Sequence, residues 1–371
     1  MKGREYFDRR MRETPGLATE HLSIYDQAYA FGATASVVES NAGSRDIVEK
    51  LGANGLLRHL TGRFSLRGAC VLRETLAFHH GLLDFAAAMQ GLGSCALALT
   101  NTHADSLANV ASGRAVCAFA LTEPNAGSDL SAIETTATPV GDTWHLKGLK
   151  HLISNAPIAD VMTVLARTDP GAGPKGMTMF LVRRGEFACT KEQEVVAFHP
   201  IGELRFDSKL PADRVVGTVG EGYKLALSVL DIFRTSVAAA ACGMAGRALA
   251  ESLDHVQLRK QFGRPLSDLP QVKAHLADMA AELEAARLAV YRSAGRKDGG
   301  AERIPFESAT AKLVACETAQ RVVDTAVQLH GGSGVLKGSV VERLYREVRA
   351  LRIYEGATDI LRLIVAGTLL S

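Results

Sequence analysis

Apolar residues in the C-terminal part of the chain recur at helical spacing. Beyond Pro270 they follow one another at intervals of four and three residues: Val272, Leu276, Met279, Leu283, Ala286 and Val290. This period places them on one face of a helix that begins after Pro270, since proline is favoured in the first helical turn. The same pattern predicts a second long helix over about 306–330 and a third over about 339–348.

The first ~113 residues also predict helices, because their leucines recur at helical spacing. The leucines are Leu51, Leu56, Leu57 and Leu60, followed by Leu72, Leu76 and Leu83. From Ala115 to about Gly217 the pattern changes to short apolar segments bounded by turn residues, which is typical of strands. The intervals between these segments are too short for helical crossovers. We therefore expect an antiparallel sheet or small barrel rather than a parallel Rossmann sheet.

This order of elements predicts an α+β fold with three parts. An N-terminal α-helical domain covers residues 1–113, a central antiparallel β-sheet or barrel domain covers 114–218, and a C-terminal helical domain covers 219–371. We find neither an internal repeat nor a low-complexity segment.

Composition narrows the class of protein. The formal net charge of +2 over 371 residues gives no broad basic face, so we expect no nucleic-acid partner. The six cysteines are scattered, without a C-x-x-C pair, which argues against a metal site and suits a reducing cytoplasm. The N-terminus is charged and lacks the apolar region of a secretory signal. The longest apolar run, 237–245, is too short to span a bilayer, so we expect a cytoplasmic protein without a membrane segment.

Two segments of the predicted sheet carry candidate chemistry. Ala120-Leu-Thr-Glu-Pro-Asn-Ala-Gly-Ser-Asp129 offers the hydroxyls of Thr122 and Ser128, and Gly127 allows a ligand to approach the backbone closely. Lys147-Gly-Leu-Lys-His-Leu-Ile-Ser-Asn155 alternates polar and apolar residues and ends in polar ones. Each also has a purely structural interpretation, as a strand that ends in a turn and as a hairpin strand.

Three segments of the helical C-terminal part are also candidates. Gln257–Leu266 contains Arg259, whose guanidinium suits a pyrophosphate, although cations followed by Gly and Pro also simply end a helix. Gln328–Gly334 contains three glycines after a helix, which either stop it or expose N–H groups to a phosphate. Glu355 lies in an apolar-flanked turn before the last helix. It is either a solvated loop residue or a general base with a raised pKa.

A glycine-rich stretch, Gly217-Thr-Val-Gly-Glu-Gly222, resembles a phosphate-binding loop. It lacks the strand and the Lys-Ser/Thr of a P-loop, and its spacing differs from the dinucleotide fingerprint. We interpret it as the linker from the sheet to the C-terminal helices.

Together, in this order, the five segments resemble the acyl-CoA dehydrogenase family. ALTEPNAGSD is similar to the first signature of that family, and RKQFGRPL, AVQLHGGSG and RIYEGATDILRLIVAG are similar to its C-terminal signatures. The resemblance covers roughly residues 40–371. It implies a helical domain, a central β-domain, a C-terminal four-helix bundle, non-covalent FAD and a homotetramer.

The resemblance also implies roles for individual residues. Leu121, Thr122, Gly127 and Ser128 would line the flavin and the thioester, and Ile153 and Ser154 would contact the flavin ring. The residues implied on the remaining parts of FAD, partly from a neighbouring subunit, are Arg259, Phe262, Gln328, Gly331, Gly332 and Thr358. Ser128, Arg234 and Glu355 would contact the substrate, and Glu355 would be the base that removes the α-proton.

The chain departs from the family pattern in three places. Leu152 replaces an aromatic residue common beside the flavin, which would open space there. Ala357 replaces a common threonine, with Thr358 one residue later. The N-terminal region is short, and the position of an alternative base on an earlier helix holds Phe233, which leaves Glu355 as the matched candidate.

The resemblance predicts α,β-dehydrogenation of an acyl-CoA, with electrons passed to an electron-transfer flavoprotein. Leu152 and the short N-terminus leave open a flavin oxidase or monooxygenase that uses oxygen on a CoA-bound or carrier-bound acyl group. A non-catalytic flavoprotein is a third hypothesis, against which Glu355 argues. The sequence does not specify the length, branching or ring content of the acyl group.

Overall fold

The computed structural model describes residues 2–370 of the chain. Its first part is helical, as expected. The helices are α1 (Lys2–Arg12), α2 (Thr19–Thr34), α3 (Asn41–Ala53), α4 (Leu66–His79), α5 (Gly81–Thr100) and α6 (Ala104–Ala111). Serines begin two of them, because the hydroxyls of Ser40 and Ser65 accept from the backbone N–H groups of Gly43 and Gly68 at 3.0 and 3.3 Å.

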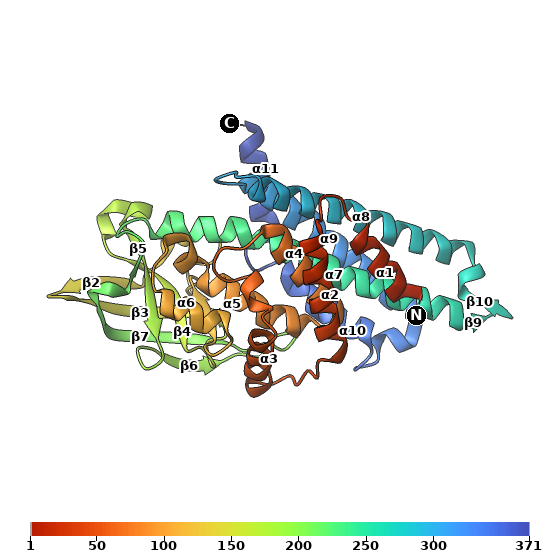
Figure 1. Ribbon diagram of the computed structural model, residues 1–371, viewed down its shortest axis with the longest axis horizontal. Helices are drawn as coiled ribbons and strands as arrows, with labels where there is room; N and C mark the ends of the chain where they lie inside the picture. Colours follow the sequence, from red (N-terminus) through yellow and green to blue (C-terminus); the bar gives the residue numbers. More distant parts are fainter. Residues whose placement is uncertain (1, 371) are drawn as a thin grey trace. The chain divides into compact units, whose positions relative to one another are not determined.

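The strands follow between residues 117 and 216. They are β1 (Cys117–Ala120), β2 (Thr136–Val140), β3 (Thr143–Ser154), β4 (Val161–Arg167), β5 (Met177–Arg183), β6 (Ala188–Glu192), β7 (Ile201–Pro211) and β8 (Val215–Val216). All eight belong to one sheet, in the order β6-β7-β3-β2-β4-β5-β8, with β1 paired to β4. Figure 1 labels the strands from β2 to β7.

The sheet differs from the expected antiparallel sheet or barrel in two respects. It is mixed, because β1 pairs with β4 in parallel, Cys117 opposite Val161, while most other pairs are antiparallel. It is also open, because β6 and β8 lie at opposite ends of the strand order. The parallel pair forms without a helical crossover, since the chain returns to β4 through the antiparallel hairpin of β2 and β3. The lack of helical crossovers between the strands therefore did not exclude parallel pairing in this sheet.

Helices return after residue 222. They are α7 (Gly222–Leu258), α8 (Pro270–Asp298), α9 (Pro305–His330), α10 (Val340–Leu351) and α11 (Thr358–Leu370). A small hairpin, β9 (Lys260–Gln261) and β10 (Arg264–Pro265), separates α7 from α8. Proline begins both α8 and α9, and α9 ends at Gly331, whose φ of +58° favours glycine. Short 3₁₀ turns connect the longer elements: η1 (Leu57–His59), η2 (Leu130–Ala132), η3 (Pro170–Gly176), η4 (Ala212–Arg214), η5 (Leu266–Asp268) and η6 (Gly331–Val335).

The chain forms two compact units, each built from discontinuous segments. Unit 1 comprises residues 1–35, 65–84 and 231–371, and unit 2 comprises residues 36–64 and 85–230. The three-domain division predicted from the sequence is not tested by this partition and stays a prediction.

The core of unit 2 is the sheet. β4 and β5 bury every residue except the last, which explains their continuous apolar sequences, whereas β6 is exposed throughout. Helix α5 approaches β1 closely, because a Cβ on Gly93 would lie 2.6 Å from Cys117 Sγ and 2.8 Å from Ala118 O. Gln90 Oε1 accepts from the Cys117 N–H at 2.9 Å. These contacts fix the strand that leads into the first candidate segment.

Unit 1 contains a buried ionic network centred on Glu74. Its carboxylate accepts hydrogen bonds from Arg287 Nε at 2.6 Å and from the Tyr291 hydroxyl at 2.7 Å. Arg287 also donates to Thr14 Oγ1 at 2.8 Å and to Arg10 O at 3.2 Å. Residues of α4 and α8 thereby hold the end of α1. Burial beside Glu74 raises the pKa of Tyr291 well above its usual value, so Tyr291 stays a donor.

Five of the six cysteines are buried and only Cys189 is exposed, as expected for small apolar side chains in a reducing environment. Two helices, α5 and α7, have the length and apolar composition to cross a membrane. In each, 83% of the apolar window is buried inside the protein, which is also typical of core helices.

We predict that Glu74→Ala lowers the free energy of unfolding by about 3–5 kcal/mol, because it removes the buried partner of Arg287 and leaves only the longer contact with the part-exposed Glu284, at 3.9 Å. Glu282→Ala is the control. Its carboxylate also binds an arginine, Arg321, at 2.7 Å, but these side chains are 41% and 57% exposed. That change should cost less than about 1 kcal/mol. Chemical denaturation checks both, and equal losses would show that the Glu74 network is not stabilising in this way.

Candidate active site

Glu355 lies in the turn between α10 and α11, in unit 1. Its φ of +54° is in the left-handed region, which costs a residue with a side chain roughly 1–2 kcal/mol. Both carboxylate oxygens are buried, and neither has a hydrogen-bond partner within residues 2–370. Burial raises the pKa of Glu355 to about 7, against the opposing effect of Arg73, Lys312 and Arg234. A carboxylate with this pKa can accept a proton near neutral pH.

Two cations hold the backbone of this turn. Lys312 of α9 is fully buried, and its Nζ donates to Leu351 O at 3.0 Å and to Gly356 O at 2.8 Å. Arg234 of α7 donates through Nε to Glu355 O at 3.1 Å. The structure thus brings Arg234 and Glu355 together. The contacts with substrate that the resemblance implies for both residues stay predictions.

Arg234 belongs to a wider charged group. Asp231 accepts from Arg234 at 3.3 Å, and its second oxygen accepts from Arg303 at 2.5 Å. Phe233, between them, is completely buried. The position of the alternative base is therefore an apolar core position, and Glu355 is the matched carboxylate.

A second buried ion pair acts electrostatically on Glu355. Arg73 of α4, 1% exposed, donates from Nε and a terminal nitrogen to the two oxygens of Asp84 at 2.8 and 3.0 Å, and to Ser236 at 2.9 Å. Its positive charge lowers the pKa of Glu355, while Asp84 raises it. The sequence analysis missed Arg73 and Lys312. Lys312 leaves a signal in the sequence, since it interrupts the apolar side of α9 between Ala309 and Ala315.

The candidate flavin-contacting segments lie together in unit 2. Thr122 follows β1, and its carbonyl accepts from the His151 N–H of β3 at 2.8 Å. Strand β3 then becomes irregular between Lys150 and Ile153, where Leu152 adopts a φ of +55° and is 48% exposed. Ile153 is buried and Ser154 is half-buried beyond this bulge.

The buried Lys150 joins the two segments. Its Nζ donates to Leu121 O at 2.8 Å and to Glu123 Oε1 at 2.7 Å. The pKa of Glu123 is lowered because its interactions with Lys150 and with two backbone N–H groups outweigh the opposing effect of burial. The pKa of Lys150 itself falls to about 8 through burial. The sequence analysis included Lys150 in a candidate segment without assigning it a role.

Gly127 and Ser128 extend the first segment and are both exposed. The turn before them closes through backbone hydrogen bonds between Glu123 and Ala126, at 2.9 and 3.2 Å. A Cβ on Gly127 would meet no atom within 4 Å, so the space beside this backbone is open to a ligand.

A third group of predicted residues is exposed elsewhere in unit 1. Arg259 follows α7, and Phe262 lies at the tip of the hairpin with a φ of +53° and 89% exposure. Gln328, Gly331 and Gly332 lie at the end of α9 and are exposed as well. The rings of His255 and His330 stack at 4.2 Å and connect the ends of the two helices.

Thr358 begins α11, and its hydroxyl donates to Glu317 Oε1 at 2.9 Å. Glu317 also accepts from Arg352 at 2.9 Å. A cofactor could therefore use the Thr358 hydroxyl oxygen only as an acceptor.

The residues present fit FAD. In unit 2, the His151–Thr122 backbone hydrogen bond brings the hydroxyl-bearing Thr122 to the segment with Leu152, Ile153 and Ser154, and this mix of apolar and hydroxyl side chains suits a flat ring with a polar edge. In unit 1, an exposed guanidinium and the open backbone of Gly331 and Gly332, where a Cβ would meet nothing within 4 Å, suit a pyrophosphate.

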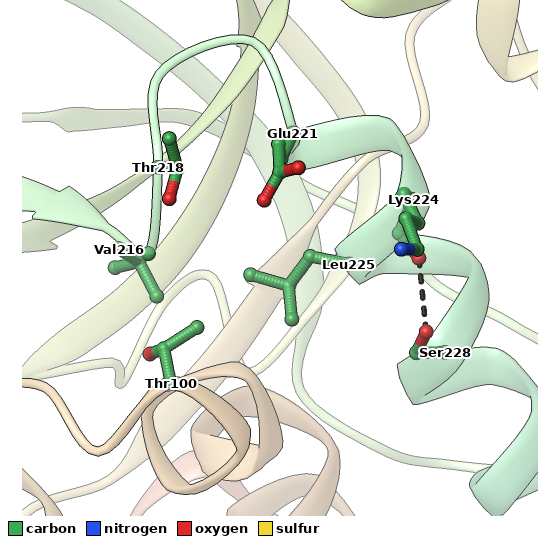
Figure 2. Close-up of a pocket in the computed structure, with 8 residues that line it drawn as sticks. Thr100, Val216, Thr218, Glu221, Lys224, Leu225 and Ser228 are labelled. Atoms are coloured by element: carbon green, nitrogen blue, oxygen red, sulfur yellow. Dashed lines mark hydrogen bonds between the residues drawn. The ribbon is translucent and has the colours of Figure 1, made fainter. Parts of the chain in front are cut away.

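A cavity of about 300 Å³ lies in unit 2 beside the start of α7. Thr100, Thr218, Glu221, Lys224, Leu225 and Ser228 are among its lining residues (Figure 2). None of the predicted site residues lines it. The stretch 217–222 forms one wall and joins β8 to α7, so the interpretation of this stretch as a linker is confirmed.

Comparison with known proteins gives one consistent result. Residues 118–208 match the middle domain of acyl-CoA dehydrogenases, and residues 220–370 match their C-terminal domain. Cyclohex-1-ene-1-carbonyl-CoA dehydrogenase of Syntrophus aciditrophicus is 40% identical over 68% of this chain and 62% of its own length. The 3-(aryl)acrylate reductase of Clostridium sporogenes is 38% identical over 70% of each chain.

Solved structures agree. Butyryl-CoA dehydrogenase of Megasphaera elsdenii superposes with a TM-score of 0.90 at 31% identity, covering 96% of this chain and 100% of its own. The FAD complex of PigA superposes with a TM-score of 0.88 at 25% identity, covering 96% and 99%.

We predict that Arg259→Ala weakens FAD binding about tenfold or more, because a hydrogen bond to a charged group contributes roughly 1.5–3 kcal/mol. Lys260→Ala, which removes the neighbouring exposed cation, should have a much smaller effect. The fluorescence of released FAD measures both affinities. Wild-type affinity in Arg259→Ala would remove the role predicted for this residue.

Proposed function

Because the chain belongs to the acyl-CoA dehydrogenase family, we propose that it removes a proton and a hydride from adjacent carbons of an acyl-CoA thioester. Members of this family are FAD-dependent oxidoreductases that act on CH–CH bonds of acyl-CoA. The observation that carries the proposal is the Glu355 carboxylate, which is buried, without a hydrogen-bond partner in residues 2–370, and has a pKa raised to about 7.

Glu355 removes the α-proton in this proposal. An α-proton of a thioester is weakly acidic, so its removal needs a base that is not already satisfied by hydrogen bonds. The Glu355 carboxylate meets this requirement. Arg234 and Lys312 bind backbone carbonyls of the turn rather than the carboxylate itself, and so orient the base without occupying it.

FAD, when bound, supplies the acceptor for the β-hydride. The chain contributes binding and orientation: the segments at Thr122 and Ser154 toward the flavin ring, and those at Arg259 and Gly331 toward the rest of the cofactor. Their contacts with neighbouring elements support this assignment, since Lys150 and His151 hold the first two segments together.

Electrons then pass to an electron-transfer flavoprotein. The relative from Acetobacterium woodii, 36% identical over 70% of this chain, is a subunit of a caffeyl-CoA reductase–Etf complex, which supports this acceptor.

We propose a cytoplasmic homotetramer. Exposed apolar side chains on α11 support association of subunits: Leu363, Leu369 and Leu370 are 68%, 73% and 88% exposed.

A flavin oxidase or monooxygenase that acts on a CoA-bound or carrier-bound acyl group is the second candidate. Leu152 favours it, because this residue is 48% exposed in a left-handed conformation, at the position where the family resemblance leads us to expect an aromatic ring. Oxygen consumption during turnover separates the two candidates. Anaerobic titration with a panel of acyl-CoAs defines the substrate, and failure of every acyl-CoA to bleach the flavin would favour a non-catalytic flavoprotein.

We predict that Glu355→Gln slows anaerobic flavin reduction by at least roughly 10²-fold, since general-base catalysis typically contributes ~10²–10⁴-fold. Substrate binding should persist, because the amide keeps the shape of the side chain. Stopped-flow absorbance measures the rate, and Glu302→Gln, at an exposed glutamate of the same unit, is the control. Rapid bleaching by Glu355→Gln would exclude Glu355 as the base.

The pH dependence of kcat/KM should report the ionisation of Glu355. Glu355 must be ionised to accept a proton, and its pKa is raised to about 7. Activity should therefore be lost as pH falls through about 7, tenfold per unit, and should level off above it. A profile that stays flat down to pH 5 would contradict this assignment.

A further inference from the structure

Lys312 is a buried cation whose hydrogen bonds, in the part of the chain that the structure describes, do not go to a carboxylate. Its side chain is fully buried in α9, and the hydrogen bonds of its Nζ go to two backbone carbonyls, Leu351 O and Gly356 O. Within residues 2–370 it forms no ion pair. Burying a charge in this way is costly, and burial lowers the pKa of Lys312. Such a residue needs an explanation beyond packing.

The two carbonyls flank the turn that carries Glu355. Leu351 is the last residue of α10, and Gly356 directly follows Glu355. The Lys312 ammonium therefore joins the beginning and the end of residues 351–356 at 3.0 and 2.8 Å. Arg234 holds the carbonyl between them, that of Glu355, at 3.1 Å. These three bonds hold Glu355 in its left-handed conformation, where both carboxylate oxygens stay free of partners.

The neighbouring acid Glu317 does not neutralise Lys312, because Glu317 is bound to Arg352 and Thr358. The positive charge of Lys312 instead acts on the carboxylate of Glu355 and favours its ionised form.

We propose that Lys312 is a positioning residue for Glu355: it closes the turn around the base and adds to the positive charge beside its carboxylate. The proposal rests on the proposed role of Glu355.

The test compares Lys312→Met, Glu355→Gln and the double variant. Lys312→Met keeps the length and apolar stem of the side chain but removes the charge and the donors. We expect its rate of flavin reduction to fall at least tenfold at pH 7. The acid limb of its kcat/KM profile should move up by about one pH unit, because an opposite charge nearby typically shifts a carboxyl by ~1–3 units.

The double variant separates positioning from general support of the fold. If Lys312 acts through Glu355, the double variant should be no slower than Glu355→Gln alone. A structural role alone would slow the double variant further and would leave the acid limb of Lys312→Met where it is in the wild type. Either result would overturn the proposal.

Lys297→Met is a matched control. Lys297 also donates to two carbonyls at the end of a helix, Ala301 O at 3.1 Å and Glu302 O at 2.7 Å, in the same unit. It should leave the rate and the pH profile unchanged. If Lys312→Met does not fold, Lys312→Gln, which keeps an amide donor and loses the charge, should show the same upward shift.

An infrared titration makes the test independent of activity. The protonated carboxyl band that disappears in Glu355→Gln reports the ionisation of this group, and its midpoint should rise in Lys312→Met. An unchanged midpoint would overturn the proposal even if activity fell. Glu355→Gln with wild-type activity would instead refute the proposed function, while the titration would still decide whether Lys312 controls the carboxyl.

Discussion

The Glu355 carboxylate is buried without a hydrogen-bond partner among residues 2–370, and this is the constraint on which the surrounding part of unit 1 depends. A lone buried carboxylate strongly favours its neutral form, so a cation is needed nearby to keep it useful as a base. Arg73, Lys312 and Arg234 provide that charge. Arg73 donates to Asp84 and Ser236, Lys312 to backbone carbonyls, and Arg234 to a backbone carbonyl and Asp231. The carboxylate is thus stabilised by the electric field of its neighbours and remains available to a proton.

Unit 2 also contains a buried lysine that binds the backbone, but this lysine is paired with a carboxylate. Lys150 binds the carbonyl of Leu121 and the carboxylate of Glu123, so its charge is compensated and its role is to hold two loop segments together. In unit 1 the charge of Lys312 is left uncompensated beside the base. Lys150 therefore mainly holds backbone segments in position, whereas Lys312 both holds the backbone and acts electrostatically on Glu355.

Several strained positions lie in the candidate segments. Leu152, Asn155, Phe262 and Glu355 have left-handed backbone conformations there, whereas Asn101 and His103 have them outside these segments. Such conformations persist only when surrounding contacts impose them. For Glu355 the three backbone bonds from Lys312 and Arg234 do so, and for Leu152 the bulge in β3 does so.

The sequence by itself determined the order of helices, strands and helices, because hydrophobic periodicity is a local property. The resemblance of its motifs indicated the family and predicted Glu355 as the candidate base. The sequence could not decide the parallel pairing of β1 with β4, since strand direction depends on how distant segments meet. Lys312 and Arg73 also escaped it. Lys312 interrupts the apolar side of α9, but the local sequence does not show that its charge, or that of Arg73, lies beside a glutamate 43 residues or more away. Only the packing of α4, α7 and α9 around residues 351–356 created that environment.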